Sequence, residues 1–120
     1  LNGEQLAAEL KAAEIPHLRF VPISFVPASH KLEGQVCGGC FVFTTDRRAL
    51  RPVRASVTVA SVITRLAPEE FDVMACRHLF GTDRTAEGIK ELRPPEGIVA
   101  EWEADEEAFR KTREAYLLYD

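Results

Sequence analysis

Cys37-Gly-Gly-Cys40 has the spacing of a thiol redox pair or of half a zinc site. A redox pair of this kind stands at a helix N-terminus, whose dipole lowers the thiol pKa, whereas Cys40 here opens a strand pattern. A structural zinc site needs two further ligands, and His30, Cys76 and His78 offer them at spacings that match no zinc module we can identify. The sequence therefore favours apolar packing for Cys40, a buried or loop-fixing role for Cys37, and no metal.

His30 and Lys31 form a second group with possible chemistry, in a polar connection between two apolar segments. Such a pair is usually part of a solvated loop. The alternative is a ligand contact in which Lys31 is a fixed cation and His30 a donor or titrating group. Pro27 and Gly34 bracket this loop, which makes it a suitable place for such a contact. Both interpretations stay open on the residues alone.

Carboxylates are poorly placed for acid–base catalysis, which needs two of them facing one cleft. Glu33 is the only acid between residues 20 and 39, and neither it nor Asp46 has a visible partner. The acids crowded at 101–107 are most simply helix-terminal and solvated. The sequence contains no Gly-x-Ser-x-Gly, phosphate loop or metal-binding His pair. It therefore displays no catalytic constellation and indicates no cofactor.

The composition is that of one ordinary globular domain of 120 residues with a net charge of -4. This charge argues against a nucleic-acid partner, and no apolar run approaches the roughly 18 residues of a membrane span. The most basic stretch holds Arg47, Arg48, Arg51 and Arg54. It is either a solvated turn and helix start or a weakly positive wall for an anionic ligand. Three cysteines, an odd number, allow one disulfide or none and leave the compartment open.

The pattern of apolar residues predicts an α+β fold, with a small sheet of two or more strands packed with about four or five helices. Strands are expected over 18–26 and 39–45. Helices are expected from an N-cap at Asn2 to Pro16, over 52–66, from Thr82 to about Leu92, over a short stretch after Pro94, and after a cap at Asp105. In the last of these, Phe109, Thr112, Tyr116 and Tyr119 would share an inner face.

The strands raise a question about the sheet. Pro22 and Pro27 lack backbone donors, which makes the first strand an edge or an interrupted strand. The second strand is apolar on both sides, as in a buried or central strand. Two strands alone rarely make a stable sheet. Either part of 68–80 supplies another strand, or a missing domain covers the exposed edge.

A run of motifs resembles one known family. The segment from Phe20 to Gly39 has the form F-x-P-x-x-F-x-P-x-x-x-K-x-x-G-x-x-C-x-G. It is similar to the C-terminal domain of the family once known only as DUF1343, which includes exo-β-N-acetylmuramidases of the NamZ type. Further matches follow in order: T-D-R at 45–47, R-P-V at 51–53, L-F-G-T-D at 79–83, I-V-A-E-W at 98–102, and A-F-R-K-T-R-E-A-Y-L-L-Y at 108–119.

The resemblance implies that residues 1–120 are the cleft-forming C-terminal domain of a larger two-domain protein, whose N-terminal Rossmann-like domain is absent here. The start at Leu1 without a Met fits a removed N-terminal portion. The full protein would release terminal N-acetylmuramic acid from the non-reducing ends of peptidoglycan fragments. Its principal catalytic groups would lie on the absent domain. Export to the periplasm or beyond is what the family favours.

The same resemblance implies a site in which this chain supplies a wall of the sugar cleft. The lactyl carboxylate of the substrate suits a cation such as Lys31 or an Arg of the 47–54 cluster. The expected substrate-binding residues are Phe25, Pro27, His30, Lys31, Cys37, Gly38 and Gly39. The partners would then be a peptidoglycan-derived sugar and the protein's own N-terminal domain. Alternatives are a non-catalytic glycan- or protein-binding module and, with less support, a thiol redox protein.

Overall fold

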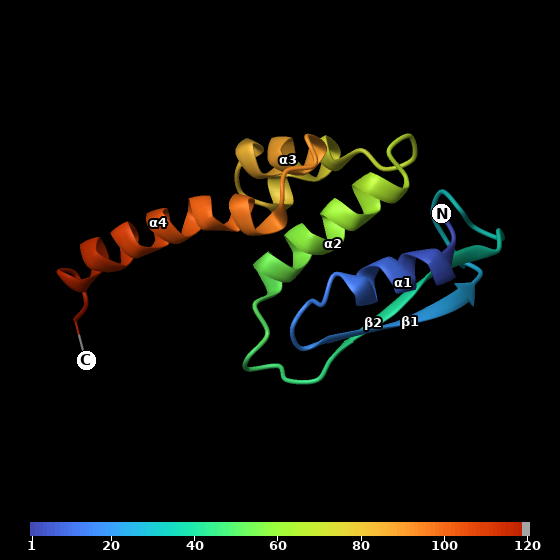
Figure 1. The fold of residues 1–120 in the computed structure, drawn as a ribbon, viewed down its shortest axis with the longest axis horizontal. Coiled ribbons are helices and arrows are strands. Elements are labelled where there is room, and N and C mark those ends of the chain that lie inside the picture. The colour runs from blue at the N-terminus through green and yellow to red at the C-terminus, as the bar shows by residue number, and fades with distance from the viewer. Residues whose placement is uncertain (119–120) are drawn as a thin grey trace.

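The computed structural model describes residues 1–118, which form an elongated body of 54 × 30 × 30 Å. Its elements follow in the order α1 (Gly3–Ala12), β1 (Leu18–Phe25), β2 (Cys37–Thr44), α2 (Pro52–Leu66), the 3₁₀-helix η1 (Val73–Leu79), α3 (Asp83–Lys90) and α4 (Pro95–Glu114) (Figure 1). Within these residues, a two-stranded antiparallel sheet with five helical segments confirms the predicted α+β class.

Local signals in the sequence explain where the helices begin. The Asn2 side chain accepts hydrogen bonds from the backbone N–H groups of Glu4 and Gln5, at 2.8 and 3.2 Å. Thr82 accepts one from the N–H of Arg84 at 3.3 Å, and α2 begins at Pro52, which needs no donor there. These three predicted helix starts are therefore confirmed.

Strands β1 and β2 form a hairpin, with Leu18 opposite Thr44 and Phe25 opposite Cys37. Helix α1 packs across one face of this hairpin and contacts both strands (Figure 1). Of the two alternatives for the sheet, a third strand from 68–80 does not occur, because residues 73–79 form η1. The prediction that β2 is a buried or central strand is wrong, because its only strand partner within residues 1–118 is β1.

Helix α2 lies between two apolar clusters and contributes to both. On one side Val62 meets Leu10 of α1 and Phe20 of β1. On the other side Val57 packs with Ile89 of α3 and Ile98 of α4, all three fully buried. Helix α2 thus joins the hairpin half of the molecule to the helical half, which fixes the hairpin relative to α3 and α4.

Helix α4 is one continuous helix of 20 residues, and the predicted break with an N-cap at Asp105 is wrong. Its buried residues lie near its start, at Ile98 and Val99. Phe109 and Tyr116, predicted to face inward, are 65 % and 78 % exposed, because the second half of α4 extends away from the rest of the described structure (Figure 1). Tyr119 of that predicted face lies outside the described residues. Over residues 1–118, no helix has both the length and the apolar character of a membrane span.

Candidate functional site

The loop between β1 and β2 carries most of the residues expected to bind a ligand, and backbone hydrogen bonds hold its shape. The N–H of Gly34 donates to the carbonyl of Pro27 at 3.0 Å, which closes the loop at the two residues that the sequence suggested. Inside it, the N–H of Glu33 donates to the carbonyl of His30 at 3.1 Å. His30 and Gly34 both have positive φ, of 73° and 75°. A non-glycine residue in this region is uncommon, so the loop holds His30 in a specific conformation.

Lys31 stands beside His30 in this loop with its side chain exposed. Among residues 1–118 it makes no ion pair, in contrast to most of the arginines of the helical half. An exposed ammonium in a backbone-fixed loop can donate to a carboxylate that approaches from outside.

Phe25 and Gly39 form a small aromatic platform at the base of the loop. A Cβ built on Gly39 would lie 3.0 Å from Cε1 of Phe25, so the ring covers the backbone of Gly39. The ring is 45 % exposed. An exposed ring of this kind offers an apolar surface to a sugar or to a protein side chain.

The adjacent glycine has a different role. A Cβ on Gly38 would lie 3.0 Å from the backbone N of Gly3, and a Cβ on Gly3 would lie 2.6 Å from the carbonyl O of Gly39. The glycines of β2 thus permit a close approach of two backbones, and the partner is the first turn of α1. Gly38 therefore positions the hairpin on α1.

The two cysteines of the C-x-x-C lie in strand β2, and their thiols contact different backbone carbonyls. The thiol of Cys37 contacts the carbonyl O of Gln35 at 3.6 Å, and that of Cys40 contacts the carbonyl O of Gly3 at the same distance. Burial raises the pKa of the Cys40 thiol, which opposes formation of a reactive thiolate. All three cysteines are free, and residues 1–118 hold no group of three potential metal-binding side chains.

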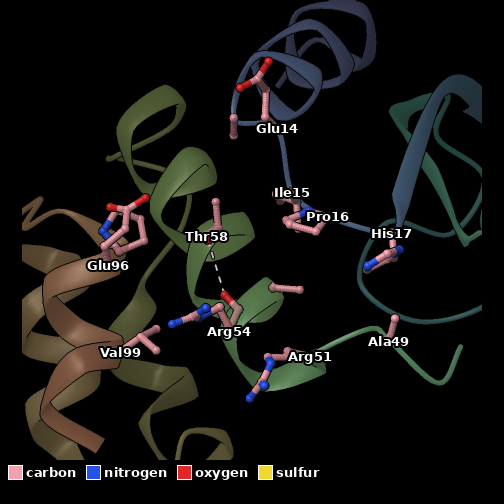
Figure 2. A pocket seen from close by; sticks show the side chains of 13 residues that line it. Glu14, Ile15, Pro16, His17, Ala49, Arg51, Arg54, Thr58, Glu96 and Val99 are labelled. Carbon is pink, nitrogen blue, oxygen red and sulfur yellow. Dashed lines mark hydrogen bonds between the residues drawn. The ribbon is translucent and has the colours of Figure 1, made fainter. Parts of the chain in front are cut away.

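A cavity of about 450 Å³ opens at the other end of the hairpin (Figure 2). Arg51, Arg54 and Glu96 line it from the starts of α2 and α4, and His17 lines it from the connection into β1. The guanidinium of Arg54 is paired with Glu103 at 2.7 Å. Sequence reasoning missed His17, whose φ of 64° marks a constrained junction after Pro16.

The structure separates two groups that the sequence places near each other. Lys31 lies in the loop beyond Phe25 and Cys37, whereas Arg51 follows the opposite end of the hairpin, where the N–H of Thr45 donates to the carbonyl of His17 at 3.0 Å. An eight-residue strand spans roughly 27 Å. Lys31 and the arginines therefore cannot bind one carboxylate together.

Most of the acids on α4 already have cationic partners. Glu101 accepts from Arg93 at 2.6 Å, Glu103 from Arg54 at 2.7 Å, and Glu107 from Arg110 at 3.2 Å. The prediction that these acids are helix-terminal is wrong, because they occupy the middle of α4. Glu103 joins α4 to α2, and Glu101 joins it to the connection after α3. Asp46 is also engaged, since its side chain accepts from the N–H groups of Arg48 and Ala49.

The Arg93–Glu101 pair makes stability depend on pH in acid. Its hydrogen bond lowers the pKa of Glu101 below the ordinary glutamate value. A carboxyl with a lowered folded pKa adds stability above its unfolded pKa of about 4.3 and loses it as the pH falls through the folded value. We expect the urea midpoint of the wild type to fall further than that of Glu101→Gln between about pH 6 and about pH 3.5. The difference should be small, since both side chains are part-exposed.

The control for this prediction is Glu96→Gln on the same helix, since Glu96 makes no ion pair among the described residues. It should keep the wild-type pH dependence. Identical midpoints for wild type and Glu101→Gln at both pH values would show that the pair contributes nothing.

The fold and the exposed loop define a class: a small α+β domain that presents a loop fixed by backbone hydrogen bonds and an aromatic platform at its base. A sequence profile described as "Exo-beta-N-acetylmuramidase NamZ, C-terminal" matches residues 1–119. The chain therefore belongs to the family of NamZ C-terminal domains, as the resemblance indicated.

Two relatives agree with this assignment. The chain is 28 % identical over 122 residues to the peptidoglycan beta-N-acetylmuramidase NamZ of Bacillus subtilis strain 168, an alignment that covers 99 % of this chain and 30 % of that protein. It superposes on the crystal structure of a DUF1343 family protein from Bacteroides fragilis with a TM-score of 0.78 and 20 % identity, covering all of this chain and 33 % of the other. The second likeness supports the fold. The chain spans about a third of the length of both relatives.

Proposed function

We propose that residues 1–120 are the C-terminal, substrate-cleft domain of a peptidoglycan-active glycoside hydrolase that releases terminal N-acetylmuramic acid from non-reducing ends. The family match over residues 1–119 is the observation that carries this proposal. The relative named for this activity is about three times as long as the matched region, which leaves room for a catalytic domain outside it.

The geometry supports a role for this chain in binding substrate and not in catalysis. Retaining and inverting glycosidases need two carboxyl groups across the scissile bond. Here Asp46 caps a turn, the acids at the centre of α4 are mostly paired with arginines, and Glu33 is a single exposed acid in the loop. In this proposal the catalytic acids belong to the preceding domain, and this domain contributes the loop over 26–36.

The loop offers two contacts that suit muramic acid. Lys31 can pair with the lactyl carboxylate, and the exposed ring of Phe25 can pack on the apolar face of a sugar. His30, Pro27, Cys37 and Gly39 would shape the surface around these two groups. Gly38 would act indirectly, by seating the hairpin on α1.

The test compares the full-length protein with residues 1–120 on a chromogenic N-acetylmuramic acid glycoside. We expect hydrolysis by the full-length protein only. Activity of the isolated chain would contradict the placement of catalysis elsewhere, and an inactive full-length protein would contradict the substrate assignment.

A non-catalytic glycan- or protein-binding module is the second candidate, favoured by the exposed loop that backbone hydrogen bonds hold in shape and by the exposed ring of Phe25 at its base. Calorimetric titration of muramic acid and muropeptides into an inactive full-length protein distinguishes the two. Binding of a protein partner with no dependence on sugar would favour the module.

A further inference from the structure

The hairpin has an apolar face that no described element covers. Residues at alternate positions of a strand share a face, and Val21 pairs directly with Phe41. The face opposite α1, which we call the outer face, includes five apolar side chains that are between 38 % and 58 % exposed: Val21, Ile23, Phe25, Phe41 and Phe43. Helix α1 lies on the other side of the hairpin (Figure 1).

The outer face is continuous and carries little charge. The rings of Phe41 and Phe43 lie 6.3 Å apart, and Phe25 covers Gly39 between the strands. Arg19, opposite Phe43, is the charged residue of the face and stands at its end. Monomeric proteins rarely leave apolar patches of this kind open to water, and a two-stranded hairpin gains stability when both faces are covered.

We infer that the protein segment preceding Leu1 forms a domain, and that an apolar surface of this domain binds the outer face. This inference rests on the proposed two-domain function. The relatives are about three times as long as this chain, so a segment large enough to cover the face is available. The carbonyl O of Leu1 lies 3.5 Å from the position of a Cβ on Gly38, so Leu1 lies beside the start of β2 on the side of the hairpin that carries α1. A preceding segment would pass one strand edge to reach the outer face.

Covalent linkage favours this occupant over a second copy of the chain. A linked domain meets the face at an effective concentration in the millimolar range, which free copies do not reach. Docking there also has a consequence for the site. Phe25 stands at the loop end of the outer face, next to the loop that contains Lys31. A domain seated on Val21, Phe41 and Phe43 would leave Phe25 and that loop at the domain boundary, where a cleft forms.

The test is a charge-pair variant of the full-length protein, Val21→Glu with Phe41→Lys. Because the two positions are directly opposite, the new charges can pair across an exposed hairpin and preserve it, whereas burial of the face against another domain makes them unfavourable. The matched control places the same charges at exposed apolar sites away from the hairpin, Leu79→Glu with Val53→Lys. A milder variant, Phe43→Thr, keeps strand propensity and removes apolar area.

Limited proteolysis at the junction before Leu1 measures docking. We expect the charge pair to release residues 1–120 about tenfold faster than wild type, Phe43→Thr to give an intermediate rate, and the control to match wild type. Equal rates for all four proteins would overturn the inference. So would a wild-type dimer that the charge pair converts to monomers at an unchanged release rate, since the face would then bind a second copy.

Hydrolysis of the muramic acid glycoside by the same proteins separates the two proposals. If the wild type hydrolyses the glycoside but the charge pair does not change the release rate, the docking inference is wrong and the proposed function stands. If the wild type is inactive but the charge pair speeds release, the docking inference stands and the proposed function is wrong.

Discussion

Replacing Gly3 by alanine should destabilise the domain by about 1–3 kcal/mol, the range of an overpacked site that must shift to fit. A Cβ at this position would lie 2.6 Å from the carbonyl O and 2.7 Å from the N of Gly39. Both contacts are with backbone, so no side chain can rotate out of the way. The first turn of α1 and strand β2 would have to separate, and the loop attached to β2 would move with it. The measurement is the free energy of unfolding from urea denaturation, followed by circular dichroism.

The matched control is Gly97→Ala on α4. A Cβ there meets nothing within 4 Å, and the position is helical. Alanine lowers the backbone entropy of the unfolded chain, so this variant should gain about 0.5–1 kcal/mol. A Gly3→Ala protein as stable as wild type would show that α1 and the hairpin are not as closely packed as the structure has them.

The helix starts were predictable because each depends on a few neighbouring residues. Asn2 and Thr82 have side chains that accept from the N–H groups two or three positions on, and these bonds form in the structure. Helix 52–66 was predictable despite its β-branched residues, because its apolar positions keep helical spacing. The sequence did not reveal that α2 packs on two sides, which places Val57 in one cluster and Val62 in the other.

The errors arise where an element's environment depends on residues distant in the sequence, or where no described element covers it. Strand β2 is apolar on both sides, a pattern typical of a central strand, yet one of those sides is the open outer face. Asp105 has the type of an N-cap, but no Pro or Gly interrupts 98–114, so the helix continues through it. Pairing of Glu101 and Glu103 with arginines of other segments could not be foreseen from spacing along α4.

The sequence predicted where the loop of the candidate site closes, but not how the candidate residues lie relative to one another. Pro27 and Gly34 were expected to bracket the loop, and the hydrogen bond between them does so. The basic stretch that contains Arg51 and Arg54 follows the loop closely in sequence. Strand β2 lies between them and carries the arginines to the opposite end of the hairpin, where His17 joins them in a separate cavity. That separation leaves Lys31 as the cation of the loop.

Lys31→Met in the full-length protein should lower kcat/KM for a muramic acid glycoside about 10- to 100-fold, the effect of losing one charge-assisted hydrogen bond to a carboxylate. Methionine keeps an unbranched apolar stem of similar length, so the loop closed by Pro27 and Gly34 should keep its shape. Lys31→Arg, which retains a cation, should recover part of the loss. Lys11→Met, at an exposed position on α1, is the control for loss of a surface charge and should match wild type.

The decisive comparison uses the same glycoside with its lactyl carboxylate converted to an amide. If Lys31 binds the carboxylate, wild type prefers the acid over the amide, and Lys31→Met treats the two alike, so that the substitution and the chemical change are not additive. If Lys31 only supports the fold of the loop, the substitution lowers both rates by the same factor and the preference for the acid survives. That second outcome would remove Lys31 from the substrate contacts. It would leave the aromatic platform at Phe25 as the part of the loop to test next.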